Sequence, residues 1–266
     1  MKQVIIVTGA SSGMGVEFAV QLAKESVQFP EYKADEIWLV ARRKEKLEET
    51  RERIHREVPD GPKVILFPID ISGAKGAREL AEYFTDNITI KVLVNNAGFG
   101  TYGEFANTSV ERQMEMTDLN CTSLIGITGY ALPYMYSNSR IINTASLASF
   151  MPLGNFAVYG ATKAYVLSFT AALRAELKDR GIKVTALCPG PVSTEFANVA
   201  SKGARKEVRH GKDPVKTVAH AIKASRKGKL YSMFAFKWKF KAFMSNLIDR
   251  RLGAWFTYKF CKRPSN

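Results

Sequence analysis

The chain has 266 residues, of which 46% are hydrophobic and 24% charged. This is the composition of an ordinary globular protein, and the length suits one large α/β domain with a generous core. Three widely spaced cysteines and three scattered histidines argue against a disulfide framework and against a metal site, and they favour a reducing, cytoplasmic compartment. No apolar run reaches the roughly 18 residues of a membrane-spanning helix, and the apolar N-terminus is expected to be a buried strand rather than a signal peptide.

The formal net charge of +14 is concentrated at one end of the chain. Residues 1–200 carry 21 basic and 22 acidic side chains, whereas residues 201–266 carry 18 and 3. The basic excess is therefore local. Because no nucleic-acid recognition module accompanies these basic residues, their charge does not predict a nucleic-acid-binding protein.

Apolar runs alternate with amphipathic stretches along the chain, which is the pattern of a parallel sheet covered on both faces. The predicted strands are Gln3–Thr8, Glu36–Ala41, Lys63–Pro68, Lys91–Asn95, Arg140–Thr144 and Lys183–Cys188. The predicted helices are Gly13–Glu25, Lys44–Glu57, Gly73–Thr85, Ser109–Tyr134, Phe156–Asp179 and Pro214–Lys223. Residues 25–35 are expected to form a small surface insertion. We predict a single doubly wound α/β domain over residues 1–228, followed by a basic, aromatic extension over residues 229–266.

A glycine-rich turn, TGASSGMG (residues 8–15), joins the first predicted strand to the first predicted helix. Gly9, Gly13 and Gly15 permit a tight turn and a close backbone approach, and the helix N-terminus offers unpaired N–H groups to a phosphate. A purely structural turn is the alternative. The remaining residues that we assign to this dinucleotide loop are Ser11, Ser12 and Met14.

The second predicted strand ends at the small, neutral Ala41, and Arg42 and Arg43 follow it. A fold that selects NAD usually places an acidic residue there to bind the ribose 2′-hydroxyl. A guanidinium is instead the natural partner of the 2′-phosphate of NADP, because it donates in a bidentate fork. We therefore predict NADP(H) rather than NAD, the alternative being that the two arginines begin a solvated basic turn.

Two further strand ends are candidates for cofactor contact. Asp70, followed by Ile71, is placed either to bind an adenine amine or to cap the next helix, and both interpretations stay open. Asn96, Ala97 and Gly98 follow the fourth predicted strand, where small residues would let the backbone approach a ribose.

The spacing of Ser146, Tyr159 and Lys163 points to proton chemistry. A tyrosine phenol has a reference pKa of about 10. A lysine four residues later on a helix lies on the same face, and its positive charge is expected to lower the pKa of Tyr159. The Ser146 hydroxyl would bind the oxygen that is reduced or oxidised. An ordinary surface pair is the alternative.

In this order and spacing, the motifs resemble those of the short-chain dehydrogenase/reductase family across roughly residues 3–225. They are the glycine turn, Asp70, NNAG (residues 95–98), Asn120, Ser146, YGATK (residues 159–163) and PGPVST (residues 189–194). The resemblance implies a Rossmann-type sheet and NAD(P)-dependent hydride transfer. It also implies a catalytic tetrad of Asn120, Ser146, Tyr159 and Lys163, in which Tyr159 exchanges the proton, Ser146 holds the substrate, Lys163 also binds the nicotinamide ribose and Asn120 supports a proton relay. The last motif would hold the nicotinamide through Pro189, Gly190, Val192 and Thr194.

One position departs from the pattern of NADP-preferring relatives, which often carry a basic residue where this chain has Ser12. Selectivity for NADP would then depend on Arg42 and Arg43. The resemblance also implies that residues 195–213 close over the substrate, as a mobile lid. Apolar residues near the matched motifs favour a bulky hydrophobic substrate, such as a hydroxysteroid: Phe99, Leu147, Phe150, Phe156 and Phe196.

The C-terminal extension combines aromatic residues at helical spacing with lysine and arginine. Such a pattern is typical of a helix at a membrane interface, which would give peripheral membrane contact. The alternative, which we favour from the sequence, is a helix that packs on its own domain or on a neighbouring subunit. The residues concerned are Phe236, Phe240, Phe243, Leu247, Lys237, Lys241, Arg250 and Arg251.

The sequence thus predicts an NADP(H)-dependent oxidoreductase that acts on a secondary alcohol or ketone. The alternatives are a 3-oxoacyl reductase of the same family and a non-catalytic NADP-binding regulator, which would typically lack the tyrosine or the lysine. The resemblance further implies a homodimer or homotetramer that pairs through the helices carrying Asn120 and Tyr159.

Overall fold

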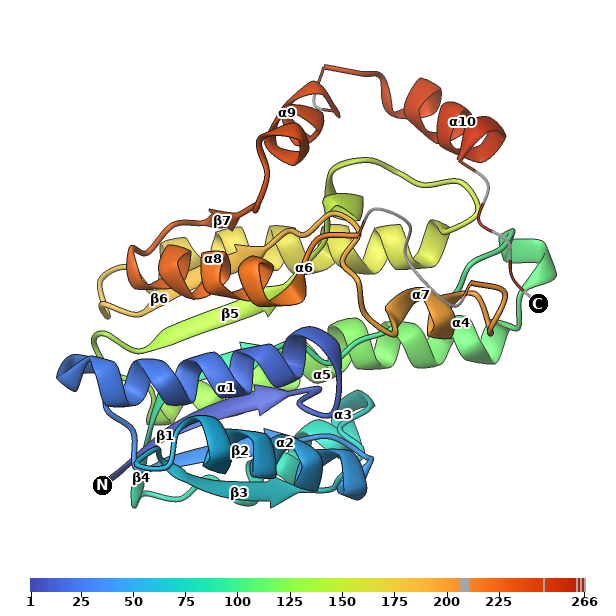
Figure 1. The fold of residues 1–266 in the computed structure, drawn as a ribbon. Helices are drawn as coiled ribbons and strands as arrows, with labels where there is room; N and C mark the ends of the chain where they lie inside the picture. Colours follow the sequence, from blue (N-terminus) through green and yellow to red (C-terminus); the bar gives the residue numbers. More distant parts are fainter. Residues whose placement is uncertain (206–210, 246, 262, 264, 266) are drawn as a thin grey trace.

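The computed structural model describes residues 1–205, 211–245, 247–261, 263 and 265. Its centre is one parallel sheet of seven strands in the order β3-β2-β1-β4-β5-β6-β7 (Figure 1). This architecture confirms the predicted doubly wound α/β fold. The strands are β1 (Lys2–Thr8), β2 (Glu36–Val40), β3 (Lys63–Phe67), β4 (Ile88–Asn95), β5 (Arg140–Thr144), β6 (Lys183–Leu187) and β7 (Tyr231–Ser232).

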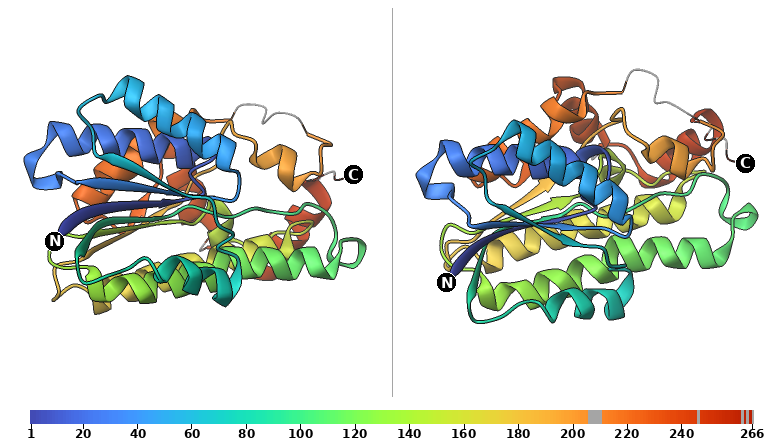
Figure 2. Two further views of the ribbon diagram at one scale, coloured as in Figure 1. Left: turned by 90° about the horizontal axis from the view of Figure 1, so that it is seen from below. Right: turned by 60° about the horizontal axis from the view of Figure 1, so that its bottom comes forward.

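Helices cover both faces of the sheet, as Figure 2 shows with the sheet seen edge-on. One face packs against α1 (Gly13–Gln28), α2 (Lys44–Glu57) and α8 (Pro214–Arg226), and the other against α3 (Gly73–Ala81), α5 (Ser123–Ala131) and α6 (Ala157–Glu176). Side chains of β1 alternate between the two cores, with Ile5 and Val7 in the first and Val4 and Ile6 in the second. Every residue from Val4 to Val7 is buried, which explains the continuous apolar run in the sequence.

The strand order changes direction between β1 and β4. Strands β2 and β3 are added on one side of β1, whereas β4 to β7 are added on the other side. β1 pairs with β2 on one side and with β4 on the other, and both pairings are parallel. The carboxyl ends of these strands therefore open onto a crevice between the loops that follow them, which is where ligands bind in open α/β sheets.

The predicted helix Ser109–Tyr134 is confirmed as one uninterrupted helical stretch from Val110 to Tyr134, but it is not a regular α-helix throughout. The structure divides it into α4 (Val110–Thr117), a π-helical turn (Asp118–Thr122), α5 and a 3-10 turn (Leu132–Tyr134). The π turn contains Asn120, whose side chain bonds to other segments of the chain, a contact that helical periodicity does not reveal. The sequence also failed to predict β7 and α7 (Phe196–Ala200), since both are too short to show periodicity.

The segment of residues 25–35 is more than a surface insertion. Helix α1 continues to Gln28 and a 3-10 turn (Pro30–Tyr32) follows. Glu25 and Arg140 form an ion pair in which the two side chains are 5% and 1% exposed. The start of this segment is therefore buried on the face of the sheet that α1 and α8 cover.

The C-terminal extension forms two helices, α9 (Phe236–Ser245) and α10 (Arg250–Phe260). Figure 1 shows them in red, outside the two helix layers that flank the sheet. None of the helices among the described residues is long and apolar enough to cross a membrane.

Candidate active site

The glycine turn after β1 has a geometry that requires glycine. Gly9 has φ +68° and Gly13 has φ +52°, in the left-handed region that L side chains rarely adopt. A Cβ on Gly15 would lie 1.9 Å from the Gly9 carbonyl oxygen, so helix α1 starts directly against the turn. Backbone N–H groups at the start of α1 are thereby presented to the crevice, as a bound phosphate requires.

The ends of β1 and β4 are fastened together at the crevice. The Thr8 hydroxyl accepts hydrogen bonds from the Asn96 N–H at 3.0 Å and the Ala97 N–H at 3.1 Å. The Asn96 side chain in turn donates to the Thr8 carbonyl at 3.2 Å. These bonds hold the NNAG motif beside the glycine turn, so that both motifs line one crevice.

Three predicted cofactor residues surround the end of β2. Arg42 Nη1 lies 3.7 Å from Asp70 Oδ2, and both side chains are more than half exposed. Arg43 Nη2 lies 3.4 Å from the Ser11 hydroxyl and 3.2 Å from Glu195 Oε2. The Asp70 carboxylate accepts the N–H of Ser72 at 3.0 Å, while the Ser72 side chain makes no capping bond to α3. Asp70 therefore fixes the start of the β3–α3 loop while facing the crevice.

Asn120 lies behind the crevice wall and is 1% exposed. Its amide nitrogen donates to the Phe99 carbonyl at 3.0 Å and to the Thr162 hydroxyl at 3.1 Å, and its oxygen accepts the Phe99 N–H at 3.1 Å. A Cβ on Gly98 would lie 2.6 Å from Asn120 Oδ1 and 3.6 Å from Lys163 Nζ. Asn120 from the π turn and Lys163 from α6 therefore converge on the same side of Gly98.

Ser146, Tyr159 and Lys163 meet at the floor of the crevice. Ser146 follows β5, and its hydroxyl accepts the Ala148 N–H at 3.1 Å, while its side chain lies near enough to the Tyr159 phenol to lower the pKa of that group. Tyr159 and Lys163 lie one turn apart on α6, and Lys163 Nζ donates to the Thr144 carbonyl at 2.7 Å. The three side chains that spacing grouped in the sequence are therefore neighbours in the fold.

The pKa of Tyr159 is shifted in the opposite direction to the one predicted from the sequence. Burial raises the pKa of Tyr159, the polar Ser146 side chain lowers it, and the neighbouring Tyr102 raises it further. Burial also lowers the pKa of Lys163 to about 8. The predicted lowering of the Tyr159 pKa by Lys163 is wrong for this geometry, because loss of water raises that pKa and the side chains that shift it are Ser146 and Tyr102 rather than Lys163.

A cleft of about 2050 Å³ connects all of these elements. It is lined by every predicted cofactor and catalytic residue except Gly15 and Asn120, which lie behind its wall. The five apolar residues predicted to surround the substrate line it as well. Phe156 stacks on Tyr159 with ring centroids 4.1 Å apart, and Phe196 lies on another side of that ring at 5.4 Å. The reacting end of the cleft is therefore aromatic.

The extension contributes a wall of the cleft that the sequence did not predict. Trp238 packs on the PGPVST turn so closely that a Cβ on Gly190 would lie 2.4 Å from its ring. The indole N–H is buried without a hydrogen-bond partner among the described residues. The aromatic spacing of the extension was visible in the sequence, but nothing local placed it over the site. The other lining residues from the extension include Phe240, Met244, Ile248, Leu252, Trp255 and Phe256.

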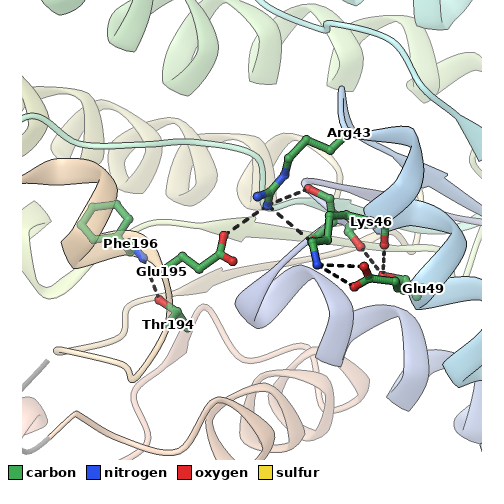
Figure 3. Close-up of polar contacts among 9 residues, drawn as sticks. Arg43, Lys46, Glu49, Thr194, Glu195 and Phe196 are labelled. Carbon is green, nitrogen blue, oxygen red and sulfur yellow. Dashed lines mark hydrogen bonds and ion pairs between the residues drawn. The ribbon is translucent and has the colours of Figure 1, made fainter. Parts of the chain in front are cut away.

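The segment after the PGPVST turn lies between the cofactor and substrate ends of the cleft. The Thr194 hydroxyl accepts the Phe196 N–H at 3.4 Å, and Glu195 between them extends to Arg43 (Figure 3). The predicted lid spans residues 195–213. Of these, residues 206–210 lie outside the described part of the chain, and residues 196–200 form α7.

Comparisons with known proteins agree with this architecture. The sequence model of the family described as short chain dehydrogenase matches residues 3–205. The NADP-dependent 3-hydroxy acid dehydrogenase YdfG of Escherichia coli is 33% identical over 205 residues, covering 75% of this chain and 77% of the relative. The ketoacyl reductase HetN of Nostoc is 31% identical over 228 residues, covering 85% and 75%.

Solved structures show the same fold. A short-chain dehydrogenase from Sphingobium yanoikuyae in complex with NADPH has a TM-score of 0.78, with 24% identity over 92% of this chain and 93% of that chain. One from Burkholderia phymatum in complex with NAD has a TM-score of 0.76, with 20% identity over 94% and 96%. The fold is thus found with either nicotinamide cofactor.

Proposed function

The chain belongs to the short-chain dehydrogenase/reductase family, and on that premise we propose that it uses NADP(H) to interconvert a bulky, apolar ketone and its secondary alcohol. Membership makes it a nicotinamide-dependent oxidoreductase of CH–OH groups. The observation that carries the proposal is that Ser146, Tyr159 and Lys163 line one cleft, at a place where Phe156 and Phe196 flank the Tyr159 ring.

The preference for NADP is supported by the charges at the end of β2. The small, neutral Ala41 stands where an NAD-selective fold would place an acidic residue, and Arg42 and Arg43 follow it. Arg43 already contacts one anionic group, the Glu195 carboxylate, which shows that its guanidinium can be approached by an anion from the cleft. A 2′-phosphate has the charge and the acceptor oxygens to bind there.

The residues at the floor suit reduction of a ketone. The nicotinamide, when bound, supplies the hydride. Ser146 would hold the ketone oxygen, and Tyr159 would donate its hydroxyl proton to that oxygen as negative charge develops. The Tyr159 phenol has a proton to donate at neutral pH, because the ordinary pKa of tyrosine is already about 10. Lys163 and Asn120 converge on Gly98 and would resupply the proton.

The lining favours a large hydrophobic substrate of the hydroxysteroid type. Phe156, Phe196 and the extension residues enclose the space in front of Tyr159 with apolar surface. A fatty 3-oxoacyl group is the second candidate, favoured by the same apolar lining and by the similarity to a ketoacyl reductase. The third candidate is a regulatory protein that binds NADP without turnover. This candidate does not explain why Ser146, Tyr159 and Lys163 are all present.

We place the enzyme in the cytoplasm as a homodimer or homotetramer. Exposed apolar residues on α4, α5 and α6 would form the subunit contact around the helices that carry Asn120 and Tyr159. They are Val110, Met114, Ile125, Tyr130 and Tyr165. Light scattering after size-exclusion chromatography tests this assignment, and a monomer at micromolar concentration would contradict it.

A panel of ketones with NADPH and NADH tests the activity, with nicotinamide absorbance as the readout. The panel contains a steroid ketone, a 3-oxoacyl thioester and a small water-soluble ketone. We expect NADPH-linked turnover that is lost in Tyr159→Phe, while NADPH still binds to that variant. Retained turnover in Tyr159→Phe would overturn the mechanism, and absence of turnover with every ketone would favour the regulatory alternative.

A further inference from the structure

We infer that helices α9 and α10 form a docking face for an anionic lipid bilayer. Ten large hydrophobic residues between positions 236 and 260 are at least 40% exposed, with Phe236 the most exposed at 82%. Apolar patches of this kind on one segment mark an interaction surface rather than ordinary packing. The docking-face residues are Phe236, Phe240, Phe243, Leu247, Ile248, Leu252, Trp255, Phe256, Tyr258 and Phe260.

The two helices are fixed to the domain by their small or inward-facing residues. In α9, Trp238 and Ala242 are buried. In α10, Gly253 and Thr257 are buried, and the Thr257 hydroxyl accepts the Gly154 N–H at 2.9 Å. Because these contacts determine which side of each helix faces the protein, Phe236, Phe243 and Phe260, which do not line the cleft, remain exposed at the surface.

The charge of this face selects the partner. Lys237, Lys239, Lys241, Arg250, Arg251 and Lys259 are exposed among the apolar residues, and Asp249 is the only acidic residue between positions 229 and 266. A second copy bound through the same face would bring two sets of these cations together. Anionic headgroups complement them, and aromatic residues mixed with lysine and arginine are typical of helices that lie in a membrane interface.

The docking face is also a wall of the cleft. Phe240, Ile248, Leu252, Trp255 and Phe256 are exposed and line the cleft as well. A bilayer on this face would therefore lie beside the entrance to the site. If the proposed ketone reduction holds, the substrate is a lipid-soluble ketone that enters from the bilayer, without crossing bulk water.

Vesicle co-sedimentation of the full chain tests the docking without cofactor or substrate. One set of vesicles contains phosphatidylcholine alone, and another contains phosphatidylcholine with about one third phosphatidylglycerol. We expect binding to the anionic set, weakened by salt and reduced about tenfold in Phe236→Ser/Phe243→Ser/Phe260→Ser, whose residues do not line the cleft. The matched control is Val27→Ser/Phe105→Ser/Val215→Ser, which changes residues of 44–56% exposure elsewhere and is expected to bind like the parent.

Other outcomes overturn the proposal. Absence of sedimentation with anionic vesicles would exclude the bilayer, and a dimer that protects Phe236 and Phe260 from exchange or labelling would assign the face to a second copy. Equal loss in the control triple variant would show a general effect of exposed apolar residues. Binding to vesicles by a chain that reduces no ketone would leave the docking intact and reject the proposed function, so the two failures are distinguishable.

Discussion

Arg43 Nη2 lies 3.2 Å from Glu195 Oε2, an ion pair between residues 152 positions apart that spans the cleft from the end of β2 to the segment before α7 (Figure 3). Glu195 thereby contacts one nitrogen of the Arg43 guanidinium, the group that we propose binds the 2′-phosphate of NADP. The neighbouring Lys46 is satisfied locally by Glu49 at 2.8 Å. The carboxylate of Glu195 and a bound phosphate would therefore compete for Arg43.

Glu195→Gln is expected to bind NADPH about two- to fivefold more tightly, because an exposed ion pair of this kind is worth about 0–1 kcal/mol. Binding of NADH should not change, since NADH carries no 2′-phosphate. Calorimetric titration with both cofactors measures the effect. Glu49→Gln, which removes a nearby carboxylate that does not contact Arg43, is the control. Equal gains for NADPH and NADH would indicate a general charge effect and contradict the competition.

Lys163 is expected to make stability depend on pH above about pH 8. Its pKa is lowered from 10.5 to about 8 by burial, so the folded chain loses a proton at a pH where the unfolded chain still binds it. Between these values the free energy of unfolding should rise with pH relative to Lys163→Met, by at most about 1.4 kcal/mol per pH unit. Below about pH 8 the difference should be constant. Urea unfolding of both proteins from about pH 7 to pH 9.5 measures it, and a flat difference across that range would reject the lowered pKa.

Glu25→Gln is expected to destabilise the fold by about 3–5 kcal/mol, because it leaves the guanidinium of Arg140 buried without a carboxylate. Glu49→Gln serves as the exposed counterpart and should cost about 0–1 kcal/mol. Chemical unfolding compares the two variants. Similar small losses in both would show that Arg140 finds another anionic partner.

Trp238→Ala is expected to release α9 while the rest of the domain remains folded. The Trp238 ring packs on Gly190, and the helix contains Lys237, Lys239 and Lys241. Trypsin should therefore cut this helix several-fold faster in the variant, since local opening exposes the backbone. Phe240→Ala removes a side chain that is 54% exposed and should leave the cleavage rate unchanged. The rates are followed by mass spectrometry, and equal rates for the parent and Trp238→Ala would contradict the role of this contact.

Local sequence determined most of the fold. The buried strands are continuous apolar runs, and α2 occupies the predicted residues Lys44–Glu57, because hydrophobic periodicity reports directly which face of an element is buried. Local sequence also predicted two parts of the site, the glycine turn and the set formed by Ser146, Tyr159 and Lys163. Backbone conformations near φ +60° demand glycine, and one helical turn fixes the spacing of tyrosine and lysine.

Three features depend on contacts between segments that are distant in the sequence, and only the tertiary structure decided them. The π turn at Asn120 follows bonds to Phe99 and Thr162, which periodicity within residues 109–134 could not show. The direction of the shift in the Tyr159 pKa follows burial of the phenol, which only the folded chain produces. The sequence identified the extension as basic and aromatic, but only the packing of Trp238 on Gly190 placed part of it over the cleft and left other residues, such as Phe236 and Phe260, exposed. Residue type and spacing determine local geometry, whereas desolvation and long-range contacts exist only once the chain has folded.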